Sequence, residues 1–164
     1  MEVLWSELSR GFAAGDELLR VLIRLAAAIL FGAVIGIERE SAGKAAGVRT
    51  HMLVTLGTAL FVIASTQSGF GSDALSRVIQ GIVTGIGFIG AGTIIKLSEE
   101  IDVRGLTTSA GIWMAAAIGV TVGLGAVGLA AIATVFAVAI LKLGVTIDNW
   151  ISRGKPSLDD PTGD

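Results

Sequence analysis

The sequence contains no cysteine, a single histidine and few charged residues. The absence of cysteine excludes disulfide bonds, thiolate metal sites and cysteine nucleophiles. Only 16% of the 164 residues are charged, whereas about 25% are charged in an ordinary soluble domain. A net charge of −2 gives no basic surface for nucleic acid. Because no nucleophile–base–acid set appears either, we expect neither a nucleic-acid partner nor an enzyme.

Long uncharged runs stand where a soluble domain would carry charges. The interval between Arg104 and Lys142 holds 37 residues without a formal charge, and the intervals after Arg49 and Arg77 hold 23 and 18, with histidine counted as neutral. A bilayer core of roughly 30 Å is crossed by about 20 helical residues. The sequence therefore predicts an all-α, polytopic membrane protein with five transmembrane helices in a lipid bilayer. We expect the helices at 18–37, 49–64, 78–95, 106–122 and 125–143.

The chain divides into three parts. Residues 1–17 mix apolar and charged side chains and are expected to form an interfacial segment, residues 18–143 the membrane domain, and residues 144–164 a polar tail, disordered from Asn149 onward. Eight Lys and Arg residues fall on the side of the first loop, the third loop and the tail, and four on the other side. The positive-inside rule therefore predicts an external N-terminus and a cytoplasmic C-terminus.

Small residues recur at every fourth position in two of the predicted helices. The first helix carries Ala28, Gly32 and Gly36, and the fourth carries Gly111, Ala115, Gly119 and Gly123. Such faces let helix backbones meet where lipid supplies no hydrophobic drive between helices. We therefore expect packing through Gly and Ala faces. We also expect the fourth helix to mediate self-association, such that Gly119→Leu abolishes association while insertion persists.

Arg24 lies within the first predicted helix, one turn before Ala28. This position directs its guanidinium into the bundle, and a charge at that depth is by default a functional candidate. No carboxylate lies inside a predicted span, so we expect the partner of Arg24 to be a backbone carbonyl, Gln80 or a bound anion. A bound anion would favour a small channel or carrier over a scaffold.

The segment between the first two helices holds the densest cluster of charge. Glu38, Arg39 and Arg49 abut apolar helix, where water is scarce and charges need partners. We expect Glu38 to pair with Arg39 or Arg49, the alternative being a solvated loop whose basic residues only set topology. Glu38 and Glu40 are candidate Mg²⁺ ligands, because Mg²⁺ takes one or two carboxylates plus water. His51 is expected to be a hydrogen-bonded polar residue or a sensor of pH or ligand.

Residues 85–90 match the G-x-G-x-x-G pattern of dinucleotide-binding folds letter for letter. That fingerprint requires a preceding strand in a soluble βαβ unit, whereas this one lies in an uncharged run, so helix packing is the better interpretation. A local helix break at 90–92 would line a cavity. Polar residues near these glycines are expected to bond across helices; they are Gln80, Thr84, Thr107, Thr108 and Ser109.

Three segments carry a family resemblance. The first contains Glu38, Arg39, Glu40, Gly43, Lys44, Gly47, Arg49, Thr50 and His51, the second Gln80, Gly85, Gly87, Phe88, Gly90 and Gly92, and the third Arg104, Gly105, Thr107, Thr108 and Trp113. In this order they resemble the MgtC/SapB family of bacterial inner-membrane proteins, over about residues 18–143. The resemblance covers the membrane domain of that family and not its C-terminal ACT-type domain.

The resemblance implies a virulence-associated family linked to magnesium homeostasis and stress adaptation. It implies a non-enzymatic inner-membrane protein that modulates membrane energetics or the response to low Mg²⁺ and acid. The expected partners are a second copy, as a homodimer or higher homo-oligomer, or another membrane complex such as ATP synthase. The alternative is a small oligomeric channel or transporter for an anion, Mg²⁺ or H⁺. No cofactor is implied beyond the Mg²⁺ that Glu38 and Glu40 could hold.

Overall fold

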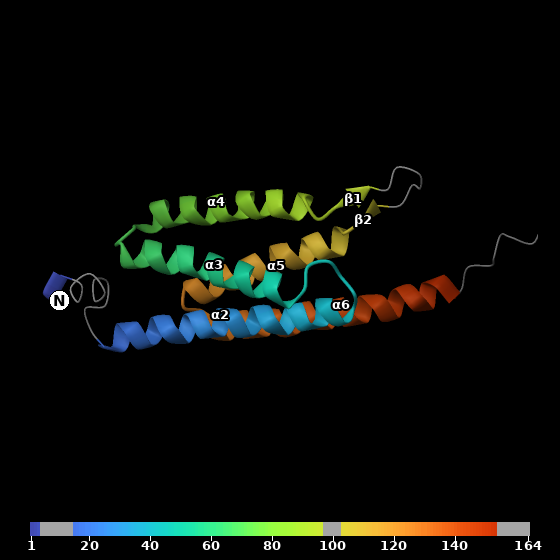
Figure 1. Ribbon diagram of the computed structural model, residues 1–164, viewed down its shortest axis with the longest axis horizontal. Helices are drawn as coiled ribbons and strands as arrows, with labels where there is room; N and C mark the ends of the chain where they lie inside the picture. Colours follow the sequence, from blue (N-terminus) through green and yellow to red (C-terminus); the bar gives the residue numbers. More distant parts are fainter. Residues whose placement is uncertain (4–14, 97–102, 154–164) are drawn as a thin grey trace, which may run out of the picture.

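The computed structural model of the protein describes residues 1–3, 15–96 and 103–153. Figure 1 shows long helices lying side by side and a short hairpin at one end. The elements are α2 (Gly15–Ser41), α3 (Val48–Gln67), α4 (Ser72–Ala91), β1 (Ile95–Lys96), β2 (Val103–Arg104), α5 (Leu106–Gly123) and α6 (Val127–Arg153). The two strands pair antiparallel, with Ile95 opposite Arg104. The five helices are long and apolar enough to cross a membrane, which confirms the predicted all-α polytopic architecture.

The helix ends differ from the predicted spans. α4 begins at Ser72 and ends at Ala91, so the expected break at 90–92 is the end of the helix, followed by a turn. α6 continues to Arg153, which shows that the disorder predicted from Asn149 is wrong as far as that residue. Charged residues mark where hydrocarbon ends and do not by themselves stop a helix, so spans read from charge differ from helices set by hydrogen bonds. The expected interfacial segment lies largely outside the described residues.

α3 is the central helix of the bundle. It packs on α2 along one side and on α5 along the other, while α6 packs on α2 and α5, and α4 packs on α5 and α3. In Figure 1 the end of α2, the start of α3, the hairpin and the start of α5 lie at the same end of the bundle. α6 projects beyond the other helices at that end. The densest charge, the first and third family motifs and the end of the second motif are therefore gathered at one end.

The predicted stripes of small residues form the contacts of α3 with its neighbours. A Cβ atom at Gly36 of α2 would lie 2.5 Å from Val48 Cα, and one at Gly123 of α5 would lie 2.7 Å from Val62 Cβ. A Cβ at Gly119 would overlap the hydroxyl of Thr58. Packing through Gly and Ala faces is therefore confirmed. The expected self-association through the fourth-helix face is wrong, because α3 of the same chain already covers that face.

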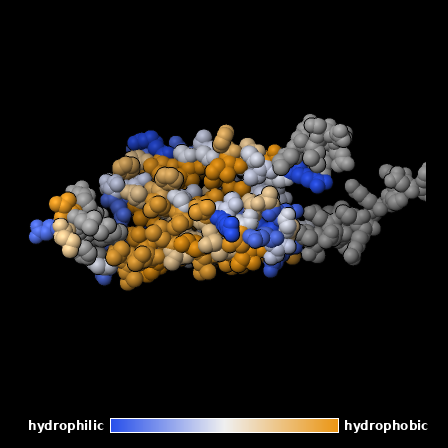
Figure 2. Space-filling model, in the orientation of Figure 1, coloured by the Kyte–Doolittle hydropathy of each residue, from blue (hydrophilic) through white to orange (hydrophobic). Residues whose placement is uncertain are grey.

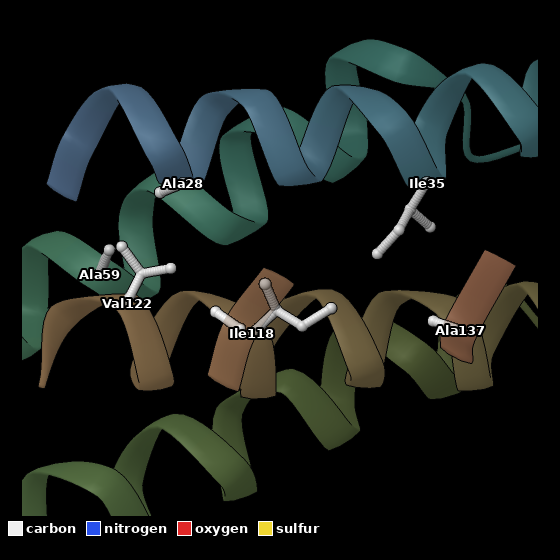
Figure 3. Close-up of a cluster of buried hydrophobic side chains, with 7 residues drawn as sticks. Ala28, Ile35, Ala59, Ile118, Val122 and Ala137 are labelled. Carbon is white, nitrogen blue, oxygen red and sulfur yellow. The ribbon is translucent and has the colours of Figure 1, made fainter. Parts of the chain in front are cut away.

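Alanine and β-branched apolar side chains fill the interior between α2, α3, α5 and α6. Figure 3 shows this cluster, in which the labelled side chains are Ala28, Ile35, Ala59, Ile118, Val122 and Ala137. The hydroxyl of Thr55 on α3 also donates to the Ala28 carbonyl of α2 at 2.7 Å. Dispersion contacts at short range and an interhelical hydrogen bond are the forces expected to hold helices together in lipid.

The outer surface is apolar along its length. Figure 2 shows apolar residues over most of the visible face and hydrophilic residues gathered toward both ends. Large exposed apolar side chains occur on several helices, among them Leu60, Phe61, Leu129 and Phe136. A soluble monomer rarely exposes so continuous an apolar surface, so this surface faces lipid.

Replacing Gly119 by leucine should destabilise the fold itself. The new side chain would overlap the Thr58 hydroxyl and the backbone of α3, and overpacking of this kind lowers the free energy of unfolding by about 1–3 kcal/mol or more. Gly128→Leu is the matched control, because a Cβ at Gly128 meets nothing within 4 Å. Thermal unfolding followed by circular dichroism in detergent measures both variants. Equal midpoints would contradict the assignment.

Candidate functional site at the α2–α3 junction

A tight connection returns the chain from α2 to α3. Gly43 adopts a φ angle of 67°, a left-handed conformation that glycine enters without steric cost. The amide of Lys44 donates to the carbonyl of Arg39 at 3.0 Å, and that of Gly43 to the carbonyl of Glu40 at 3.0 Å. These bonds satisfy the last carbonyls of α2. The last turn of α2 therefore lies directly beside the first turn of α3.

Arg39 is buried at this junction and pairs with its neighbour Glu38. The Arg39 Nε atom lies 2.5 Å from Glu38 Oε2, and Nη2 lies 2.8 Å from Oε1. The Arg39 side chain is 1% exposed and that of Glu38 is 9% exposed. Of the two partners that the sequence left open for Glu38, the structure thus selects Arg39. Arg49 is exposed to the surroundings.

His51 completes a polar junction with Glu38 and Arg39. Its ring is fully buried, and Nδ1 donates to the Gly47 carbonyl at 2.9 Å. The expectation of a hydrogen-bonded histidine is therefore met. The other ring nitrogen, Nε2, and the Nη1 atom of Arg39 have no hydrogen-bond partner among the residues that the structure describes. Both side chains adjoin Gly111 of α5, where a Cβ would lie 3.4 Å from His51 Nε2 and 3.9 Å from Arg39 Cδ.

The carboxylate of Glu40 binds the first turn of α3. Its Oε2 atom accepts a hydrogen bond from the amide of Val48 at 3.0 Å, which places a negative charge at the positive end of the α3 dipole. Glu38 is held by Arg39, so both carboxylates suggested as Mg²⁺ ligands are engaged in other contacts. Within residues 1–3, 15–96 and 103–153, no group of three or more His, Asp or Glu side chains is placed to hold a metal ion.

Arg24 binds the turn between α5 and α6. Its Nη1 atom donates to the Gly123 carbonyl at 3.1 Å. Gly125 adopts a φ angle of 88°, and a Cβ there would lie 2.6 Å from Arg24 Nη2. Of the three expected partners, the backbone carbonyl is therefore the observed one. The guanidinium satisfies a terminal carbonyl of α5, at the end of the bundle opposite the polar junction.

The second and third family motifs meet where α4 passes into α5. Gly90 is buried, and a Cβ there would lie 2.6 Å from Ser109 Oγ. Gly105 precedes α5 with a φ angle of 97° and approaches the Thr93 carbonyl so closely that no Cβ would fit. Thr108, in the first turn of α5, is buried. These residues fix the end of α4 against the start of α5.

Other motif residues face outward. Thr84 donates to the Gln80 carbonyl of its own helix at 2.9 Å, and both residues are exposed, so the predicted bonds from these two residues to another helix of the same chain are wrong. The remaining outward residues are Lys44, Gly85, Gly87, Phe88, Gly92, Arg104, Thr107 and Trp113. Thr50 is half-buried. Some motif residues are therefore buried between the helices, and others lie on the outer surface of the bundle.

Two residues have roles that the sequence did not predict. Gly111 belongs to a stripe of small residues typical of helix association, whereas the structure places it against His51 and Arg39. Thr55 lies one turn after His51, and its hydroxyl bridges α3 to α2 by donating to the Ala28 carbonyl. The sequence signal for this bond is a hydroxyl within an apolar span.

The fold and this junction define a five-span membrane protein with a buried ion pair at one end. Residues 25–150 match the family model described as "MgtC family". The chain belongs to the MgtC family.

The chain is similar in sequence to proteins of several bacteria. "Protein SrpB" of Synechococcus elongatus is 43% identical over 142 residues, which cover 80% of this chain and 78% of that protein. "Protein MgtC" of Brucella abortus is 47% identical over 119 residues, 73% of this chain and 49% of that protein. "Putative magnesium transporter YhiD" of Escherichia coli is 42% identical over 131 residues, 74% and 59% respectively. The chain thus spans about half the length of the Brucella protein. No solved structure matches it.

Breaking the buried pair should be far more damaging than removing an exposed charge. Arg39→Met leaves the Glu38 carboxylate buried without its partner, which costs about 3–5 kcal/mol. Lys44→Ala is the control, since Lys44 is exposed. The double variant Glu38→Leu/Arg39→Met should recover much of the loss, because an apolar pair leaves no uncompensated charge. Unfolding midpoints in detergent test this, and a double variant less stable than Arg39→Met would contradict it.

Proposed function

We propose that the protein is a non-enzymatic regulator in the bacterial inner membrane that acts by lateral helix association through α4. Its partner is a second copy or another membrane complex, such as the ATP synthase suggested by the family resemblance. The observation that supports this proposal is the outward glycine face of α4, formed by Gly81 and Gly85. A Cβ at either glycine would meet nothing within 4 Å, whereas the glycines of α5 are covered within the chain.

α4 is the least enclosed helix of the bundle. Only 11% of its most apolar stretch is buried, against 50% for α5. The side chains buried on α4 are Ile86 and Gly90, and both belong to its C-terminal half. A helix with small residues and this much open face fits a partner helix, because close backbone approach is the main source of affinity in lipid.

The polar residues on α4 favour the same interpretation. Gln80 and Thr84 are exposed on an apolar helix, and a side-chain amide in lipid gains most from a hydrogen bond across helices. Thr84 follows Gly81 by three residues, so its hydroxyl lies beside the glycine face on the helix surface. A groove of about 370 Å³ lined by Phe61, Gly81, Gly85 and neighbouring apolar residues lies between α3 and α4. It would receive the side chains of the associating helix.

The orientation and the biological setting complete the proposal. Lys and Arg are in excess on the side of the polar junction, which supports placing that end and the C-terminus in the cytoplasm. The link to magnesium is supported by the family resemblance and by the name of the Escherichia coli relative, "Putative magnesium transporter YhiD". On this basis we assign the protein to adaptation of the inner membrane to low Mg²⁺ or acid.

Leucine at Gly81 and Gly85 should weaken association without disturbing the fold. Each substitution enters open space in the single chain, so thermal stability in detergent should stay unchanged, whereas the partner helix would be pushed away. We expect at least a tenfold loss of association, which corresponds to about 1.4 kcal/mol. Energy transfer between labelled copies in liposomes measures self-association, and co-purification from native membranes measures other partners.

Gly128→Leu is the control for this experiment, because Gly128 lies on α6 with equally open surroundings. It should behave as the unmodified chain does. If the Gly81 and Gly85 variants associate as strongly as Gly128→Leu in both assays, α4 is not the interface and the proposal fails.

A further inference from the structure

A groove of about 540 Å³ lies between α2 and α6, beside the polar junction. The two helices pack side by side (Figure 1), and the volume of the groove lies in the range of about 300–1,000 Å³ that is typical of ligand sites. Apolar and polar side chains both line it, among them Val34, Ile37, Glu38, Ser41, Val138 and Lys142. A ligand that fills the groove therefore meets both kinds of surface.

The apolar and polar parts of the groove follow each other in the same order on both helices. On α2, Val34 precedes Glu38 by about one turn, and on α6, Val138 precedes Lys142 by about one turn. Glu38 and Lys142 are also the first charged residues after the apolar stretch of each helix, so they mark the level at which hydrocarbon gives way to lipid headgroups. The groove thus runs from the hydrocarbon into the headgroup layer, as a phospholipid does.

The apolar wall is open to the surrounding membrane. Val34 is 40% exposed and Ile37 is 56% exposed. Glu38 also lines the groove, although its side chain is only 9% exposed. An acyl chain can therefore enter sideways from the bilayer and lie along the apolar wall, with its headgroup beside Glu38.

Opposite charges in one groove favour a headgroup that carries both signs. Arg39 donates to each oxygen of Glu38, and a carboxylate has about four lone-pair sites, so Glu38 can still accept from a primary ammonium. Lys142 interacts with the rest of the chain, but its ammonium has three donors and can hold a phosphate oxygen as well. The Ser41 hydroxyl can donate to the same phosphate. A headgroup with only negative charge would face the like charge of Glu38.

We propose that this groove binds one phosphatidylethanolamine molecule from the leaflet beside the polar junction. Lys142 and Ser41 hold its phosphate, and Glu38 accepts from its primary ammonium. The lipid site goes beyond the proposed association through α4 and does not depend on it, since α4 packs on α3 and α5. The bound headgroup also reaches the carboxylate that pairs with buried Arg39, which links the lipid composition of the membrane to the junction.

Native mass spectrometry of the full chain in detergent, titrated with phospholipids of identical acyl chains, tests the proposal. Phosphatidylethanolamine and phosphatidylcholine have the same net charge, but the trimethylated ammonium of phosphatidylcholine has no N–H to donate. We expect the first phosphatidylethanolamine to bind at least fivefold more tightly than the first phosphatidylcholine or phosphatidylglycerol. This comparison uses the unmodified chain and needs no variant to fold.

Lys142→Gln should weaken the binding of phosphatidylethanolamine at least fivefold, because it removes the positive charge beside the phosphate. Lys44→Gln is the matched control. Lys44 is also an exposed lysine at this end of the bundle, but it does not line the groove. The control variant should bind the lipid as the unmodified chain does.

Three results would overturn the inference. Equal affinity for phosphatidylethanolamine and phosphatidylcholine would show that Glu38 holds no ammonium. Tightest binding of phosphatidylglycerol would show a site for anions. Equal binding of phosphatidylethanolamine by Lys142→Gln and Lys44→Gln would place the lipid elsewhere on the apolar surface.

Discussion

The fold depends on the close approach of the α3 backbone to α2 and α5. Lipid provides no hydrophobic drive between helices, so contact distance and hydrogen bonds decide which helices adhere. At Gly36 and Gly123 a single added carbon would lie within 2.7 Å of α3 atoms. Thr55 adds a hydrogen bond to the Ala28 carbonyl. Once α3 is held between two helices in this way, the end of α2 and the N-terminal part of α5 are fixed beside its first turn.

That approach explains the buried charges at the junction. Arg39 lies about one turn beyond Gly36, so it follows the same face of α2 under the first turn of α3. A buried guanidinium is tolerated only with a partner, and Glu38 supplies one within the same turn of helix. Glu40, two residues later, is turned to the Val48 amide instead. The two acidic residues thus have different roles. Glu38 pairs with a buried cation, and Glu40 accepts a hydrogen bond at the start of the next helix.

Much of the fold could be predicted from sequence because lipid imposes strong rules. Three uncharged runs predicted four of the five helices, and an apolar run interrupted by Arg20 and Arg24 predicted the first. The four-residue spacing of small residues in the first and fourth helices predicted the faces that meet. The partner of each face could not be predicted, since spacing identifies a face without saying whether the same chain covers it. For the same reason Gln80 and Thr84 were expected inside. The Glu38–Arg39 pair was predicted only as one of two choices, because Arg49 also adjoins apolar helix, at the start of the next span.

The uneven attachment of α4 has a structural consequence. Its C-terminal end is anchored where Gly90 meets Ser109, while its N-terminal half lacks buried residues. Only residues 68–71 join α3 to the N-terminal end of α4, so that end stays beside the end of α3 although few of its side chains are buried. The interior of the bundle therefore depends little on what the N-terminal half of α4 carries. Sequence change along this half alters the perimeter that the membrane meets and leaves the interlocked helices as they are.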